Sequence, residues 1–112
     1  MTTEWDALPD NIRTFMTALD DREVDRALAT LTTDAVVTDE GHDYTGRGDI
    51  AAWLTDAASE YTYTTEFTGA TTTDTTVDVG QHLEGNFPGG VADLPYRFTL
   101  DGALISRLVI EP

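Results

Sequence analysis

Apolar residues in the first half of the chain recur at the spacing of a helix. Between residues 5 and 19 they lie three or four positions apart, which places them on one helical face. Pro9 fits only the first turn of this helix, because proline has no amide hydrogen to donate from an interior position. The same spacing predicts a short second helix and a third helix further along. The three apolar faces consist of Trp5, Leu8, Ile12, Phe15, Met16 and Leu19; of Val24, Ala27, Leu28 and Leu31; and of Ile50, Trp53, Leu54 and Ala57.

After Ser59 the period of the pattern changes from helical to two, which is typical of strands. Asp101-Gly102 is a hairpin signal between two of these strands, and residues 69–74 and 85–90 are predicted connections rich in turn residues. An earlier β-branched run, residues 35–39, predicts one strand among the helices, followed by a turn at residues 40–43. The inward positions of the late strands are Tyr61, Tyr63 and Phe67; Val77, Val79, Gln81 and Leu83; and Leu94, Tyr96, Phe98 and Leu100, before a last strand at residues 103–110.

The order of these elements defines the fold class. Helices come first and a run of hairpin-connected strands follows, which indicates an α+β fold in which three N-terminal helices pack on a mostly antiparallel sheet. A chain of 112 residues has room for one core, and neither a linker nor an internal repeat divides it. We therefore expect a single domain over residues 1–112.

Charge is the most unusual property of the composition. Asp and Glu number 21 against 6 basic residues, a formal net charge of −15, and every basic residue is arginine. This usage resembles that of proteins from salt-loving organisms, in which salt screens the repulsion between acidic groups. A moderately acidic bacterial protein without lysine is the alternative. Disorder, a further consequence of high net charge, is disfavoured by the regular apolar pattern.

The same composition narrows the possible partners and locations. A strongly acidic chain repels phosphate backbones and anionic lipid surfaces, so we expect neither nucleic acid nor a membrane as a partner. The first residues lack the basic and apolar regions of a secretory signal, which predicts a cytoplasmic protein. The chain has no cysteine and therefore no disulfide and no thiolate chemistry.

Four segments carry a resemblance to a known family. They are residues 15–21 (FMTALDD), 31–39 (LTTDAVVTD), 44–50 (YTGRGDI, followed by Trp53) and 96–102 (YRFTLDG). In this order and at these separations the chain resembles the nuclear transport factor 2-like superfamily, in its SnoaL-like and ketosteroid isomerase-like branch. The resemblance implies a curved sheet wrapped over the helices as a cone-shaped half-barrel with a pocket. It also implies a homodimer, and a cofactor-independent isomerase, cyclase or dehydratase acting on a small apolar molecule that carries a carbonyl group.

Asp39 is the foremost candidate for acid–base chemistry. It ends an apolar strand, where an apolar wall would disfavour its charged form and suit it to carry a proton near neutral pH. The resemblance places the general base of ketosteroid isomerases at this position. A solvent-exposed aspartate at a strand end is the alternative. By the same resemblance the oxyanion-hole positions of those isomerases fall on Phe15 and Leu94, which cannot donate a hydrogen bond, so steroid isomerisation is not expected.

His42 and a set of aromatic and apolar residues complete the candidate site. His42 follows Asp39 by three residues and could act with it as a dehydratase-type acid–base pair, or it could be a surface residue. Grouped with Glu40 and Asp43 it is a weak metal signal, and we expect neither a metal nor a cofactor. The predicted ligand-binding wall consists of Phe15, Trp53, Tyr63, Leu94, Tyr96 and Phe98. His82, on the opposite strand parity, is expected on the outer face.

Two functions remain open at this stage. The first is an enzyme in which Asp39 moves a proton on an apolar carbonyl compound. The second is a non-catalytic ligand-binding or dimerisation module with the same pocket. A hydrogen-bond donor facing Asp39 across the pocket would favour the enzyme, and the sequence identifies none with certainty.

Overall fold

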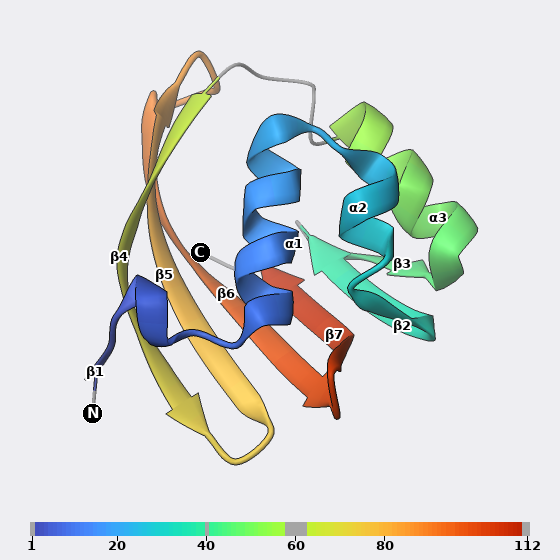
Figure 1. Cartoon of the computed structure of the whole chain (residues 1–112). Coiled ribbons are helices and arrows are strands. Elements are labelled where there is room, and N and C mark those ends of the chain that lie inside the picture. The colour runs from blue at the N-terminus through green and yellow to red at the C-terminus, as the bar shows by residue number, and fades with distance from the viewer. Residues whose placement is uncertain (1, 40, 58–62, 111–112) are drawn as a thin grey trace.

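Three α-helices lie on one face of a curved sheet (Figure 1). The computed structural model describes residues 2–39, 41–57 and 63–110. In chain order the elements are β1 (Thr2–Thr3), the 3₁₀ turn η1 (Trp5–Ala7), α1 (Asp10–Asp21), α2 (Val24–Leu28), β2 (Leu31–Asp39), β3 (His42–Thr45), α3 (Gly46–Ala52), the π-helical turn η2 (Trp53–Ala57), β4 (Tyr63–Thr73), β5 (Thr76–Gly85), β6 (Val91–Asp101) and β7 (Leu104–Ile110). This architecture confirms the predicted α+β class.

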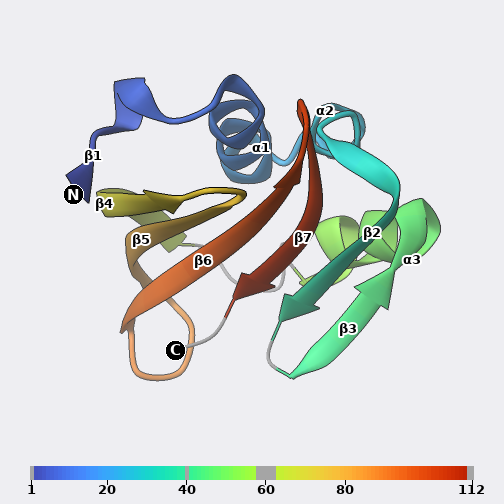
Figure 2. The same cartoon turned by 90° about the horizontal axis from the view of Figure 1, so that it is seen from below.

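Within the described residues, the sheet has seven strands in the order β1-β4-β5-β6-β7-β2-β3. All neighbours are antiparallel except β2 and β7, which run parallel. Register shifts interrupt the ladders within β4, between Phe67 and Gly69, and within β6, between Thr99 and Leu100. Bulges of this kind bend a strand, and Figure 2 shows the sheet curling around the helical layer.

Helix α1 forms the centre of the helical layer. Its buried residues lie three or four positions apart and face the sheet, and Asp10 in its first turn interacts favourably with the positive end of the helix dipole. The helix ends at Arg22, which adopts a left-handed conformation with φ of 58°. The amides of Arg22 and Glu23 donate to the carbonyls of Leu19 and Ala18, a Schellman ending that satisfies the last turn.

The core lies between α1 and the central strands. Phe15 of α1 and Phe98 of β6 are both fully buried, and their rings meet edge to face with centroids 5.7 Å apart. On the inner face of the sheet a continuous row runs from Asp39 through Ile110 and Tyr96 to Val79 across four strands. Ile110, Tyr96 and Val79 are all at most 5% exposed, so this row is the floor beneath the helices.

The sequence pattern missed both edge strands. Strand β3, at residues 42–45, begins within the turn predicted at residues 40–43, and β1 pairs with Ala70 and Thr71 at the other edge of the sheet. Three of the four β3 residues are exposed, so this edge strand has no alternating apolar pattern to detect. Residues 69–73 also belong to β4 rather than to a connection, and they consist mostly of exposed threonine. Trp5 lies in η1 rather than in α1, with its ring 5.6 Å from that of Phe67.

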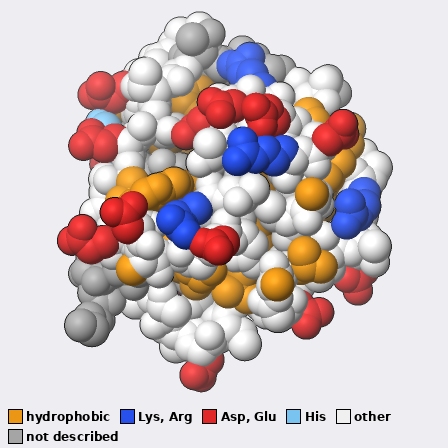
Figure 3. Space-filling view, in the orientation of Figure 1, with side chains coloured by type: hydrophobic (Ala, Val, Ile, Leu, Met, Phe, Trp, Pro, Cys, Tyr) orange, Lys and Arg blue, Asp and Glu red, His pale blue; other side chains and the backbone are white. Residues whose placement is uncertain are grey.

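The outer face of the sheet carries charged side chains. Arg97 donates to Asp78 at 2.8 Å, and His82 lies 2.7 Å from Asp93, which confirms the outward placement of His82. The carboxylates of Asp93 and then Glu84 raise the pKa of His82. Acidic groups also outnumber basic ones over the face drawn in Figure 3. In the part of the chain that is described, no helix is long and apolar enough to cross a membrane.

We expect the melting temperature to rise by about 10 °C between 0.1 M and 2 M KCl, because screening of the net charge of −15 removes a repulsion that opposes folding. Differential scanning calorimetry over a KCl series measures this rise. A melting temperature that stays flat over the series would show that the acidic composition does not depend on screening.

Candidate functional site

Asp39 ends β2 with its side chain on the inner face of the sheet. It shares this face with Val37, which is fully buried, and it is half-buried itself. The indole Nε1–H of Trp53 donates a hydrogen bond to Asp39 Oδ2 at 3.0 Å. Asp39 Oδ1 makes no hydrogen bond with any described residue. One oxygen is therefore held in place, while the other has no hydrogen-bond partner among the described residues.

Trp53 is the positioning partner of this carboxylate. It is 3% exposed and begins η2 directly after α3, and its ring lies 6.1 Å from the ring of Tyr44 on β3. Packing from α3 and β3 thus fixes the direction in which the indole N–H points. The sequence predicted Trp53 only as part of an apolar wall, because nothing in its spacing from Asp39 shows a hydrogen bond between them.

Two tyrosines lie near Asp39 on the sheet side. Burial raises the pKa of Tyr96 well above its ordinary range, with further upward contributions from Tyr63, Asp39 and Asp20. Burial also raises the pKa of Tyr63; Asp20 and Asp39 add to this shift, and Arg22 opposes it. Both phenols therefore keep their protons at neutral pH and are available as donors. Neither hydroxyl is hydrogen-bonded to another described residue.

The backbone pairing of β2 with β3 places His42 beside Asp39, but no hydrogen bond joins the two side chains. The two residues are directly opposite each other in the β2–β3 ladder, so their Cβ atoms are about 5 Å apart. His42 is exposed and contacts no described side chain by a hydrogen bond or ion pair. Asp43 accepts a hydrogen bond from Thr38 at 2.6 Å, and Glu40 lies outside the described residues. Among the described residues, no three acidic or histidine side chains form a group that could hold a metal ion.

The other predicted wall residues differ in their access to a ligand. Leu94 and Tyr63 are half-buried on the inner face, and the ring of Tyr63 meets that of Phe87 edge to face at 6.3 Å. Phe15 and Phe98 have no exposed surface at all. A ligand can touch these two rings only after the side chains around them move, so in this structure they support the site from below.

Gln81 is a buried polar residue of the inner face that sequence reasoning treated as core packing. It is 5% exposed and lies opposite Leu94 and Phe67 in its two ladders. Among the described residues, its only side-chain partner is the sulfur of Met16, 4.0 Å from its amide nitrogen. A thioether is a weak acceptor, so the free energy of this contact is smaller than the desolvation penalty of burying the amide.

We expect Gln81→Met to leave the free energy of unfolding unchanged or to raise it by about 1 kcal/mol, because an apolar side chain of similar length removes the buried amide. Urea denaturation measures the change. Gln81→Glu is the matched control and should destabilise the protein, since it buries a charge. A loss of stability in Gln81→Met would show that the amide contributes to the fold.

The comparisons with known proteins agree with this architecture. The family model of the SnoaL-like domain matches residues 12–107, so the chain belongs to the SnoaL-like domain family, within the nuclear transport factor 2-like superfamily. A proposed polyketide cyclase from Sinorhizobium meliloti is 30% identical, with a TM-score of 0.91 over 97% of this chain and 100% of that one. A search of curated proteins gave no match.

Two more distant structures show the fold alone. A Mycobacterium tuberculosis protein in complex with estradiol-17beta-hemisuccinate is 12% identical, with a TM-score of 0.74 over 91% of this chain and 90% of that one. A Catenulispora acidiphila protein with a ketosteroid isomerase-like fold, in complex with trimethylamine, is 16% identical, with a TM-score of 0.78 over 93% and 85%. Proteins of this fold thus include some that hold small molecules.

Proposed function

We propose that this protein is a cofactor-independent enzyme that moves a proton on a small, apolar, carbonyl-bearing molecule, as an isomerase, cyclase or dehydratase does. The observation that carries the proposal is the inward carboxylate of Asp39, held through one oxygen by the Trp53 indole and close to the protonated phenol of Tyr96. A base and a hydrogen-bond donor near each other are what proton abstraction next to a carbonyl requires.

The chemistry follows from these groups. Asp39 takes a proton from the carbon beside the carbonyl, the electrons of that C–H bond form a carbon–carbon double bond, and negative charge develops on the carbonyl oxygen. Tyr96 donates a hydrogen bond to that oxygen. The protonated Asp39 then returns the proton to the same or another carbon, or gives it to a leaving hydroxyl group. His42, across the ladder and open to solvent, is the proposed route by which Asp39 exchanges its proton with water.

The remaining residues form the surroundings of the ligand. Trp53, Tyr63, Leu94 and Tyr96 are the proposed contacts, with Phe15 and Phe98 packed beneath them. The apolar neighbours favour an apolar body on the ligand and keep water from the reacting carbon. No cofactor enters this scheme, because a carboxylate and a phenol suffice for enolisation.

The test is deuterium exchange into 4-phenylcyclohexanone, a simple apolar ketone, followed by NMR in deuterated buffer. We expect the protein to accelerate exchange at the carbons beside the carbonyl above the rate in buffer alone. Binding of the ketone without any acceleration would overturn the enzymatic proposal. Absence of binding and of exchange would overturn the pocket as well.

The second candidate is a non-catalytic ligand-binding or dimerisation module. It is favoured by the outer sheet face, where Thr64, His82 and Arg97 present a mixed polar surface to a second copy. We propose that the chain forms a homodimer through this face. Sedimentation equilibrium in high salt should give twice the chain mass, and a monomer at high protein concentration would refute the pairing.

A further inference from the structure

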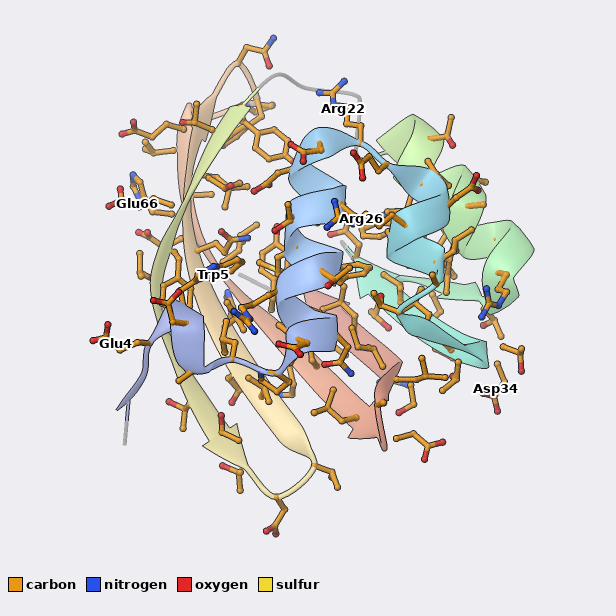
Figure 4. The ribbon with its side chains drawn as sticks, in the orientation of Figure 1. Glu4, Trp5, Arg22, Arg26, Asp34 and Glu66 are labelled. Carbon is orange, nitrogen blue, oxygen red and sulfur yellow. The ribbon has the colours of Figure 1, made fainter. Side chains whose placement is uncertain are left out.

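A depression of about 300 Å³ lies where the C-terminal end of α1 meets the start of β4. It is lined by Leu19, Asp20, Arg22, Tyr63, Thr64 and Thr65. Figure 1 shows the end of α1 and the start of β4 at the same end of the molecule, and in Figure 4 the side chain of Arg22 marks this end. The depression therefore opens between the helical layer and the sheet.

Asp20 is the hydrogen-bond acceptor of this depression. Both of its carboxylate oxygens lie 3.1 Å from the hydroxyl of Thr65, which has one hydrogen to share between them. A carboxylate has about four acceptor positions, so most of the acceptor capacity of Asp20 remains open. Burial raises the pKa of Asp20, the Thr65 bond opposes that shift, and Asp21 adds to it. Asp20 is nevertheless an exposed residue, so its open acceptor positions can be reached from the depression.

Tyr63 belongs both to the lining of the depression and to the proposed site around Asp39. Tyr63 lines the depression, and its pKa responds to both Asp20 and Asp39. The buried Tyr96 also responds to both carboxylates and to Tyr63. Tyr63, Thr65 and the half-buried Phe67 are every second residue of β4 and therefore lie on the same face of the strand. Asp20 and Asp39 therefore both act on the same two tyrosines.

We propose that the depression holds the outer end of the same ligand, with Asp20 accepting a hydrogen bond from a neutral hydroxyl group on it. The substrate class is thus an apolar molecule with a carbonyl at its inner end and a hydroxyl at its outer end. This inference rests on the proposed function of the Asp39 site. Arg22 in the lining disfavours an ammonium group there, and Asp20 itself disfavours a carboxylate, so a neutral donor is the group that fits both.

The experiment compares 4-phenylcyclohexanone with 4-(4-hydroxyphenyl)cyclohexanone, which differ by one hydroxyl at the end opposite the ketone. Isothermal titration calorimetry of the whole chain should show the hydroxylated ketone binding about tenfold more tightly. Asp20→Ala should abolish this preference, so that the two ketones bind with equal affinity. Asp21→Ala, at the adjacent exposed position outside the lining, is the matched control and should keep the preference.

A second measurement uses only the wild-type protein and so does not depend on whether a variant folds. In the wild-type protein, ring protons beside the hydroxyl should give nuclear Overhauser effects to the methyl group of Thr65. Equal affinity for the two ketones, or a preference that survives Asp20→Ala, would overturn this inference. The proposed function would still stand if the ketones bind and the protein accelerates deuterium exchange. If neither ketone binds, the inference and the proposed function both fail.

Discussion

Replacing Phe98 by alanine is expected to lower the free energy of unfolding by about 3–5 kcal/mol, close to the largest loss that a single truncation causes. Phe98 lies in the middle of β6, between Val77 and Leu108 in its two ladders, and all three side chains are fully buried. Its ring meets Phe15 edge to face, so the truncation removes one of the core contacts that join α1 to the sheet. The melting temperature should fall by about 15 °C.

The matched control for this prediction is Val91→Ala, on the same strand. Val91 is 55% exposed, so its truncation should change stability by less than about 0.5 kcal/mol. If Phe98→Ala fails to fold, Phe98→Leu provides the measurement, at about half the cost. A loss below about 1 kcal/mol in Phe98→Ala would mean that the helices and the sheet are not joined by this core.

Replacing Asp39 by asparagine is expected to slow deuterium exchange into 4-phenylcyclohexanone by at least about 100-fold, because the side chain keeps its shape and loses its basicity. The amide oxygen of asparagine can still accept the hydrogen bond from Trp53, so the ketone should bind with little change. The melting temperature should not fall, since a half-buried charge has been removed. Exchange rates from NMR and thermal denaturation measure the two effects.

Asp43→Asn is the matched control for this variant. Asp43 is one register position from Asp39 in the β2–β3 ladder and interacts with Thr38 instead of the indole. Its replacement should change the exchange rate by less than about twofold, because it does not lie on the inner face. An equal loss in both variants would assign the effect to the overall charge rather than to a base at residue 39.

The elements that sequence predicted well are those with one buried face. The alternation along β5 and β6 and the stripe along α1 are recorded in the sequence because only one side of each element meets the core. The edge strands β1 and β3 were missed because their stability comes from backbone pairing at the sheet margin. The left-handed Arg22 was also undetectable, since a helix ending of this type usually has glycine at that position.

The site was predictable in part for the same reason. Asp39 is recognisable because it ends an apolar strand, and the inward parity of Tyr63 and Tyr96 follows from the alternation. The bond between Trp53 and Asp39 spans 14 residues, and that between Asp20 and Thr65 spans 45. Neither spacing has a local pattern, because the contacts depend on how α3 and α1 sit against the sheet.

The chain offers an internal reporter for the central claim, that a ketone binds beside Asp39. It has two tryptophans, whose indole N–H groups are expected to give two separate NMR signals. Trp53 donates to Asp39, whereas Trp5 packs on Phe67, at the opposite end of α1 from Arg22 in Figure 4. On titration with 4-phenylcyclohexanone, the account predicts that the Trp53 indole signal shifts in step with binding while that of Trp5 stays in place. Saturable binding that leaves the Trp53 signal unmoved would contradict it.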